Sequence, residues 1–503
     1  MATTRRQFLG QMGGSGVGLL GLRSAVAAPV GEAGKPPNIL FLFSDDQRWD
    51  ALGCMGNPVI QTPNLDALAR EGVLFRNSFV TTSICAPNRA CVLSGQYVRR
   101  HGIDDFFKTF PDAALQETYP ALLRAKGYYT GFIGKWGIGD SIGATARGAA
   151  IFDYWGGASH QTNFWHERTC RYVTHDGVHG KTDNTCTCPP DARGRAGPHV
   201  RTGKANMKDP VHLTTDIIPA KVQGFLSQRD PQKPFCLSVF FKSPHGPLDF
   251  DPKFSKLYAG QEMPRPATAT LEDRARRPSF FNGKLGDGTG HRWVRVPETL
   301  HAHTRAYYRL ITGMDETIGK IRKTLEEQGV SDNTLILFTS DNGHFKGEFG
   351  LAGKWMMYEP SIRVPGIAYD PRLPPARRGR SNDAMIITPD FSATIVAAAG
   401  VPVPARYQGR SLLPLLRESD PPWREDWFYE HPYEHKGKIE PCEGVRTRRW
   451  KYTRYYRQKP VFEELFDLDT DPLERHNLAG DPAHKATLDQ LRKRWQEYSE
   501  GLS

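Results

Sequence analysis

Three features are scarce or missing in this 503-residue chain, and each limits what the protein can be. No stretch after residue 28 approaches the ~20 consecutive apolar residues that a membrane-spanning helix needs. Cysteine is infrequent, and the spacing of the eight cysteines lacks the paired Cys-x-x-Cys motifs or following histidine pair of a zinc site. The Arg-Arg pairs lack the interleaved aromatic residues and single basic face of a nucleic-acid-binding surface. We therefore expect no membrane span, no zinc site and no nucleic-acid partner.

The composition is that of a globular protein with many loops. Hydrophobic residues make up 39% of the chain and aromatic residues 11%, with 49 glycines and 38 prolines. A length of 503 residues exceeds what one hydrophobic core usually serves, so we expect two packed units or one large domain with an appendage. The net charge of +11 is spread along the chain. It suits an anionic substrate, or else marks a solvated basic surface without a role.

The first residues have the layout of an export signal. Two arginines at positions 5 and 6 precede a short, glycine-rich apolar stretch, which ends in small residues including Ala25-Val26-Ala27. This layout is typical of a secretory signal peptide, and the paired arginines resemble a twin-arginine signal. We expect residues 1–28 to be removed and the mature protein to be periplasmic or extracellular. The alternative is a surface helix that carries two arginines.

Three of the eight cysteines lie in one segment rich in glycine, proline and threonine, between residues 156 and 212. In an oxidising compartment Cys170 could pair with Cys186 or with Cys188, and the sequence does not choose between them. Either disulfide would close a loop that contains few apolar residues.

Polar residues follow two strongly apolar runs. Residues 38–43 lead into Asp45 and Asp46, and residues 334–339 lead into Asp341 and Asn342. Short apolar runs of this kind are typical of strands buried on both faces of a parallel sheet. Ligands of such sheets bind beyond the carboxyl ends of the strands, where both polar clusters are expected.

The remaining pattern predicts an α/β protein. Further strands are expected at 130–133 and 235–241, and apolar spacing predicts helices at 64–71, 120–126, 216–228, 305–328 and 390–399. Alternation of strands and helices predicts a large, mixed, mostly parallel sheet sandwiched by helices. We place the catalytic domain at residues 36–405. Short aromatic and basic runs after residue 410, followed by a charged helix near 485–498, predict a small antiparallel sheet plus one helix, as a second domain over 410–503.

The four polar residues at the strand ends share a chemical property, since Asp45, Asp46, Asp341 and Asn342 all offer oxygen ligands. Oxygen ligands suit a hard cation, so the sequence predicts Ca²⁺, with Mg²⁺ as the alternative. A single aspartate more often caps a helix or a turn, and two clusters at two strand ends favour the metal site.

The most distinctive motif is Cys85-Ala86-Pro87-Asn88-Arg89, which is followed by Leu93-Ser94-Gly95. Together with the two polar clusters it resembles the type I, formylglycine-dependent sulfatases of the alkaline phosphatase superfamily, over the chain from Pro37 to its end. Further matching segments are Gly134-Lys135-Trp136, Ser243-Pro244-His245, residues 350–354, Arg363-Val364-Pro365 and residues 466–478.

The resemblance implies a fold and a chemistry. It implies an alkaline phosphatase-like fold and hydrolysis of a sulfate ester, with a sulfated carbohydrate as the expected substrate. In this family a separate maturation enzyme oxidises the motif cysteine, here Cys85, to formylglycine, whose hydrate binds the metal and attacks sulfur. Arg89, Lys135 and Lys354 match the family's cationic residues around the sulfate, and His245 matches the histidine that contacts the leaving oxygen.

The chain departs from the family at three positions. Asn88 replaces a common serine of the maturation motif, and Phe349 replaces a frequent histidine. Gly137 stands where family members commonly have a histidine that acts as a base when sulfate is eliminated. His101, His212 and His344 are candidates to replace that histidine.

Two other functions fit the same motifs. One is a phosphonate or phosphate monoester hydrolase of the same superfamily, and the other is a sulfated-glycan-binding pseudoenzyme that has lost turnover along with the histidine at 137. Phosphatases with two zinc ions are disfavoured, because their sites need more His and Asp ligands than the sequence offers. The substrate itself, the mode of attack on a glycan chain and the oligomeric state have no signature in the sequence.

Overall fold

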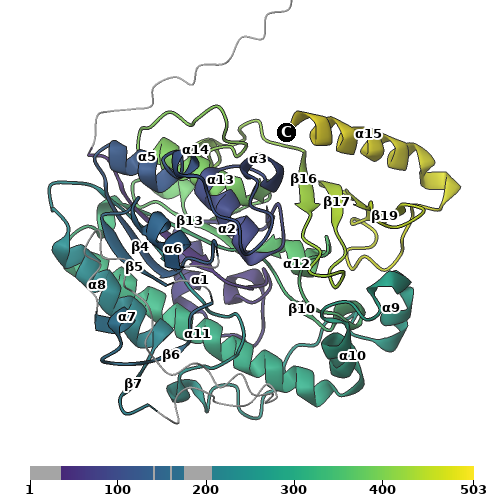
Figure 1. Cartoon of the computed structure of the whole chain (residues 1–503), viewed down its shortest axis with the longest axis horizontal. Coiled ribbons are helices and arrows are strands. Elements are labelled where there is room, and N and C mark those ends of the chain that lie inside the picture. Colours follow the sequence, from purple (N-terminus) through teal and green to yellow (C-terminus); the bar gives the residue numbers. More distant parts are fainter. Residues whose placement is uncertain (1–34, 140–141, 159–160, 175–206, 503) are drawn as a thin grey trace, which may run out of the picture. The chain divides into compact units, whose positions relative to one another are not determined.

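A computed structural model describes residues 35–139, 142–158, 161–174 and 207–502 (Figure 1). Residues from Pro36 onward form one compact unit. The expected export signal and two of the three candidate disulfide cysteines, Cys186 and Cys188, lie outside the described residues. Cys170 is buried. Within the described part of the chain, no helix combines the length and apolar character needed to cross a membrane.

An eight-stranded sheet forms the centre of the fold. The order of its strands is β14 (Arg380–Asn382), β2 (Val73–Phe75), β13 (Gly366–Tyr369), β9 (Thr334–Ser340), β1 (Asn38–Ser44), β8 (Phe235–Phe240), β4 (Tyr129–Lys135) and β5 (Tyr154–Ala158). All neighbours pair in parallel except β13, which is antiparallel to both β2 and β9. The prediction of a mixed, mostly parallel sheet is confirmed.

Fifteen α-helices are assigned within the described residues. They are α1 (Pro63–Glu71), α2 (Cys85–Ser94), α3 (Val98–His101), α4 (Asp112–Leu115), α5 (Tyr119–Ala125), α6 (Ile142–Ala149), α7 (Arg171–Thr174), α8 (Ile218–Gln228), α9 (Leu271–Arg276), α10 (Asp287–Arg295), α11 (Pro297–Glu327), α12 (Glu359–Ile362), α13 (Thr388–Ala398), α14 (Leu413–Arg417) and α15 (Lys485–Gly501). The longest, α11, begins at Pro297, eight residues before the predicted start, because proline is well accommodated in the first turn of a helix.

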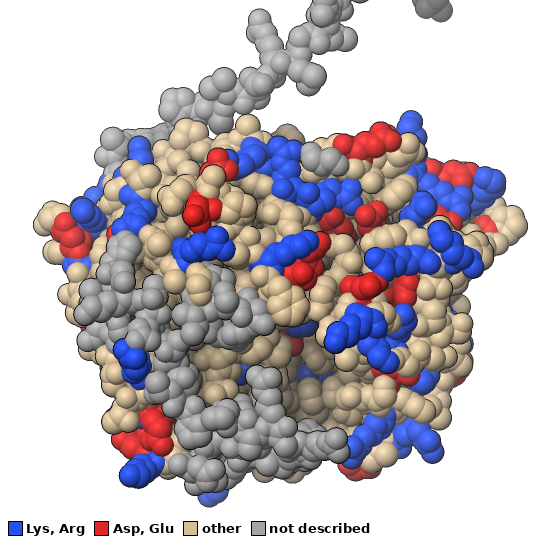
Figure 2. Space-filling view, in the orientation of Figure 1, with Lys and Arg blue, Asp and Glu red and all other residues tan. Residues whose placement is uncertain are grey.

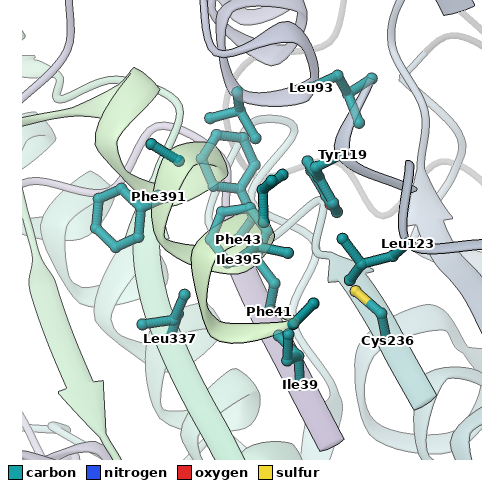
Figure 3. Close-up of a cluster of buried hydrophobic side chains, with 14 of the residues drawn as sticks. Ile39, Phe41, Phe43, Leu93, Tyr119, Leu123, Cys236, Leu337, Phe391 and Ile395 are labelled. Carbon is teal, nitrogen blue, oxygen red and sulfur yellow. The ribbon is translucent and has the colours of Figure 1, made fainter. Parts of the chain in front are cut away.

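Alternate side chains of β1 face two separate hydrophobic cores. Ile39, Phe41 and Phe43 pack against residues of α2, α5 and α13, as Figure 3 shows for Leu93, Tyr119, Leu123, Phe391 and Ile395. Leu40 and Leu42 face the opposite core, which is built from α1, α8 and α11. Because both faces are covered, the strand reads as an unbroken apolar run, and helices lie on both sides of the sheet.

A smaller sheet follows near the C-terminus. Strands β16 (Asp426–His431), β17 (Cys442–Thr447), β18 (Trp450–Tyr455) and β19 (Phe462–Asp467) pair in sequence order and antiparallel. Leu488 and Leu491 of α15 belong to the same hydrophobic cluster as this sheet. The predicted antiparallel sheet plus helix is confirmed, and the domain boundary near residues 405–410 stays a prediction.

Short two- and three-stranded sheets complete the fold and position loops. They are formed by β10 (Phe345–Lys346) with β11 (Ala352–Gly353), by β12 (Arg363–Val364), β3 (Ser78–Phe79) and β15 (Ile386–Ile387), and by β6 (Trp165–Glu167) with β7 (Pro210–His212). The hairpin of β10 and β11 matters most, because it carries Lys346 and leads directly into Lys354.

Candidate active site

Four neighbouring parallel strands end at one edge of the sheet, and each delivers a polar residue there. Asp341 follows β9, Asp45 and Asp46 follow β1, and Lys135 is the last residue of β4. The register pairs Ser44 with Ser340, so the acids that follow them lie side by side. The loop after β8 joins this edge, because the backbone N–H of Asp45 donates to the carbonyl of Ser243 at 3.1 Å.

The cysteine motif reaches this edge from a helix. Cys85 is the first residue of α2, and Arg89 lies one turn later, on the same side of the helix. The Sγ atom of Cys85 is 3.4 Å from Oδ1 of Asp45 and 2.8 Å from Nζ of Lys354. Position 85 is therefore inside the cluster of polar residues at the strand ends.

Three basic side chains compensate three buried carboxylates. The guanidinium of Arg89 donates to Oδ2 of Asp341 at 2.9 and 3.1 Å and lies 3.5 Å from Asp45. Lys135 pairs with Asp45, and Lys354 pairs with Asp46. Unpaired charges would be costly at this burial, so these contacts hold the residues in place.

The titratable groups of the site differ in the direction in which their pKa values are shifted. Burial alone raises the pKa of Asp45, but the positive charge of Lys135 and of its other basic neighbours outweighs it and holds that pKa well below the ordinary value. For Asp341, burial and the negative charge of Asp45 outweigh Arg89 and raise the pKa to about 7. Burial, with Asp45, raises the pKa of the Cys85 thiol to about 12. An unmodified Cys85 is thus a neutral thiol at neutral pH and a weak nucleophile.

The same residues can hold a divalent cation. Ligand atoms of Asp45, Asp46, Cys85 and His245 all lie within 4.8 Å of one another. Asn342 adds a buried Oδ1 atom without a hydrogen-bond partner, while its Nδ2 donates to Asp46 at 2.5 Å. An orphaned oxygen beside crowded carboxylates fits a cation, because a divalent ion would relieve both the like-charge repulsion and the missing contact.

Two residues of the site have positions that sequence reasoning did not foresee. His245, assigned there only to the leaving group, also belongs to the possible ligand cluster; its Nε2 is 3.6 Å from Oδ2 of Asp46 and its Nδ1 is 2.6 Å from the carbonyl of Gly246. Asn88, the departure from the maturation motif, donates through Nδ2 to the carbonyl of Asp341 at 2.5 Å. The site therefore uses Asn88 to tie α2 to the end of β9.

A cavity of about 610 Å³ opens onto these residues. Cys85, Lys135, His245 and Lys354 line it together with Phe106, Phe107, Gln161, Leu285, Trp355, Tyr433, His435 and Ile439. Phe107 is 67% exposed, which is high for a large apolar side chain. The cavity thus combines a polar, cationic end with a largely apolar and aromatic lining. On the molecular face drawn in Figure 2, basic and acidic side chains are interspersed.

Gly137 lines this cavity with a backbone that favours glycine. Its φ is +72°, and a Cβ atom there would lie 3.0 Å from Cδ of Arg89 and 3.2 Å from Cε of Lys135. A histidine at this position would be strained and would press on two of the cationic residues.

Of the three histidines that sequence reasoning offered as substitutes, His344 lies close enough to Asp46 and Lys354 to interact with their charges, whereas His101 and His212 have other surroundings. His101, His212 and His344 are not among the described residues that line the catalytic cavity. Nε2 of His101 contacts Cys91 at 3.3 Å, and His212 stacks on Phe164. His344 has its Nδ1 2.6 Å from the carbonyl of Phe345. His435 is a cavity-lining histidine that sequence reasoning missed; its Nδ1 is 2.9 Å from Oη of Tyr433. No motif in the sequence marks it.

Comparisons with known proteins agree with this arrangement. A family profile described as Sulfatase matches residues 37–401, and one described as N-sulphoglucosamine sulphohydrolase, C-terminal, matches residues 347–501. The chain is 30% identical to an N-acetylglucosamine-6-O-sulfatase of Bacteroides thetaiotaomicron, over 91% of this chain and 85% of that protein.

Solved structures are similar as well. One is a protein in complex with its substrate D-glucosamine-2-N,6-O-disulfate, with a TM-score of 0.73 and 26% identity over 93% of this chain and 98% of that one. Another is a phosphonate monoester hydrolase of Agrobacterium radiobacter, with a TM-score of 0.73 and 21% identity over 93% and 96% of the two chains. The second likeness shows the fold alone.

Proposed function

Because this chain belongs to the formylglycine-dependent, type I sulfatases of the alkaline phosphatase superfamily and is a sulfuric ester hydrolase, we propose that it removes sulfate from a carbohydrate with Cys85, converted to formylglycine, as its nucleophile. The single observation that carries the proposal is the contact of Cys85 with Asp45 and Lys354 at the strand ends. A formylglycine-generating maturation enzyme is the implied partner.

The residues around position 85 suit an oxygen nucleophile better than a thiol. Asp45, Asp46, Asp341 and Asn342 would hold the ion, and we propose Ca²⁺ because hard cations prefer oxygen ligands. A thiol would be a poor ligand in that set, whereas a hydroxyl of a formylglycine hydrate at position 85 would complete it. When bound, the ion supplies Lewis-acid stabilisation of negative charge on the reacting oxygens.

The chain's own cations would bind and orient the sulfate. Lys135 and Lys354 line the cavity beside position 85. Arg89, on α2, is buried next to them and contacts Asp45 and Asp341. Fixed positive charges in a site that excludes water stabilise the charge that spreads over sulfate oxygens as the ester bond breaks. Their buried ion pairs keep these side chains in place before the substrate arrives.

His245 is the proposed proton donor to the leaving alcohol. Its contact with the carbonyl of Gly246 keeps a proton on Nδ1, so Nε2 is the nitrogen that would exchange the transferable proton. Burial lowers the pKa of His245 to about 4, so Nε2 is unprotonated in the free site, and the negative charge of a bound sulfate ester would favour its protonation. Nε2 lies on the side of Asp46, and the side chain lines the cavity. The task of the family histidine at position 137 falls to a cavity-lining group, for which His435 is the candidate.

His245→Gln is expected to reduce kcat by about 10²- to 10³-fold with an alkyl or sugar sulfate. The loss should shrink towards tenfold or less with 4-nitrophenyl sulfate, because that leaving group needs little protonation. His291→Gln, at a half-buried position of α10 outside the cavity, is the control. Equal losses with both substrates would exclude a proton-donor role for His245.

Gly137→Ala is expected to lower both stability and turnover. The positive φ costs about 1 kcal/mol for a non-glycine residue, and displacement of Arg89 should reduce kcat/KM about tenfold. Gly329→Ala is the matched control, since its φ of +63° is similar and nothing lies within 4 Å of the added Cβ. Thermal melting and initial rates measure the two effects. If both variants keep wild-type rates, the contact of position 137 with Arg89 has no functional weight.

The relatives narrow the choice of substrate. The N-acetylglucosamine-6-O-sulfatase and the glucosamine disulfate complex both concern sulfated glucosamine, so we propose a 6-sulfated amino sugar as the first substrate to test. We also propose export of the protein, which is supported by the N-terminal signal and by a relative named an extracellular sulfatase.

Ion chromatography of released sulfate tests the proposed function. The purified protein, matured in cells that contain the maturation enzyme, should release sulfate from N-acetylglucosamine-6-sulfate or another member of a sulfated-sugar panel. It should hydrolyse an aryl sulfate faster than an aryl phosphonate. Faster phosphonate hydrolysis would assign the chain to the phosphonate hydrolases, and binding without any sulfate release would make it a glycan-binding pseudoenzyme.

A further inference from the structure

A second cavity, of about 300 Å³, shares no lining residue with the catalytic cavity. Its wall comes from four parts of the chain: the segment 48–58 after β1, residues 264–266, residues 304–308 of α11 and Lys346 of β10. The two cavities are neighbours through Tyr307, whose hydroxyl donates to the carbonyl of Asp46 at 2.6 Å and accepts from the backbone N–H of Arg48 at 3.0 Å.

Lys346 is the unusual residue of this cavity. It is only 4% exposed, and its Nζ lies 3.3 Å from Nδ1 of His303 and 3.5 Å from the centre of the Tyr307 ring. No carboxylate of the described residues lies within ion-pairing distance of it, whereas Lys135 and Lys354 each have one. Burial, with Arg48, lowers the pKa of Lys346 well below its ordinary value, so a bound anion is what would keep this amine charged.

Other groups on the wall are donors without a matching acceptor. Thr304 is only 3% exposed, and its buried Oγ1 has no hydrogen-bond partner. The hydroxyl of Tyr308 accepts from Asn57 at 2.7 Å, which leaves its own proton to donate. Arg265, an exposed residue, adds a guanidinium that donates to the backbone carbonyls of Ala269 and Val294.

The carboxylate on the wall is already occupied. Asp50 accepts two hydrogen bonds of 2.7 Å from Arg48, which also pairs with Glu348. The cavity therefore presents a lysine, an arginine and two hydroxyl groups against one neutralised acid. An excess of buried donors over acceptors is the chemistry that recognises an oxyanion.

We propose that this cavity is a second anion site, which binds a sulfate group through Lys346, Thr304 and Arg265. The sulfate is either the free ion or a sulfo group on a neighbouring residue of a glycan. The site does not depend on turnover at Cys85, so its test can fail or succeed independently of the proposed enzymatic function.

Titration calorimetry of the full-length protein with sodium sulfate tests the proposal. Lys346→Met should bind one sulfate ion fewer per chain than the wild type, because affinity at the second cavity falls roughly 10- to 100-fold. Thr304→Val should weaken the same site by roughly tenfold or less. Methionine fills the volume of the lysine, and thermal melting checks that each variant is folded. Lys323→Met, on the same helix as Thr304 but 75% exposed, is the control and should bind like the wild type.

Crystals soaked in selenate give a second readout. An anomalous selenium peak is expected within hydrogen-bonding distance of Lys346 Nζ and Thr304 Oγ1 in the wild type and is expected to vanish in Lys346→Met. Absence of the peak in the wild type, or a folded Lys346→Met that binds as many sulfate ions as the wild type with unchanged affinity, would each overturn the proposal.

A glycan arm separates the two sources of the anion. The same variants are titrated with a disulfated glucosamine disaccharide. If Lys346→Met weakens binding of the disaccharide as much as that of sulfate, the anion is a sulfo group of the substrate chain. If only sulfate binding weakens, the ligand is the free ion.

Discussion

Cys85→Ala should abolish sulfate release, with a loss of about 10⁴-fold or more in kcat, because it removes the nucleophile of the reaction. The environment supports so large an effect: the side chain is buried, 3.4 Å from Asp45 and 2.8 Å from Lys354, and no other cysteine lines the cavity as described. The residual activity would come from the surrounding cations alone. Initial rates with an aryl sulfate measure the loss.

The chemical state of Cys85 is the decisive companion measurement. Conversion of the CH₂–SH group to an aldehyde removes one sulfur and two hydrogens and adds one oxygen, so the peptide mass falls by about 18 Da, which lies outside the usual ladder of cysteine oxidation. Cys91→Ala is the matched control, because Cys91 is a buried cysteine of the same helix that contacts Thr81 and His101 instead of the site. A fully active enzyme with an unmodified Cys85 thiol would falsify the proposed nucleophile.

Chelation of the bound cation is expected to abolish activity, by at least about 10³-fold, while the fold persists. The reason is the balance of buried charge: Asp45, Asp46 and Asp341 face Arg89, Lys135 and Lys354, so formal charges cancel without an ion. A divalent cation then leaves the site positive, which favours a sulfate ester. Melting temperature should fall by only several degrees on chelation, and added Ca²⁺ should restore activity.

Asp45→Asn should behave differently from chelation. It leaves Lys135 without its carboxylate in a buried site, at a cost of about 3–5 kcal/mol in the free energy of unfolding, and it also removes a metal ligand. Denaturant titration and metal analysis by mass spectrometry measure the two effects. Asp112→Asn is the control, since that side chain is 80% exposed. A chelated wild type that unfolds as readily as Asp45→Asn would show that the basic side chains do not compensate the acids.

Local patterns predicted much of the fold. The apolar runs at β1 and β9 could be recognised because both faces of each strand are covered, which leaves no charged residue in either run. Helix α2 was not predicted, since Pro87 lies in its first turn and the helix has little amphipathic pattern. The start of α11 was also missed, because the first turns carry histidines and a threonine rather than a clear apolar stripe.

By itself the sequence determined which strand ends carry acids and which cysteine begins the distinctive motif, because both features depend only on residues that are neighbours in the sequence. Only the tertiary structure decided that Lys354 touches Cys85, that His245 joins the possible metal ligands, and that Arg89 and Lys135 crowd the space a side chain at position 137 would need. It alone decided that Lys346 and Thr304 meet on the wall of a second cavity. Contacts of this kind join segments tens to hundreds of residues apart, and their geometry depends on how the layers pack, which no local pattern records.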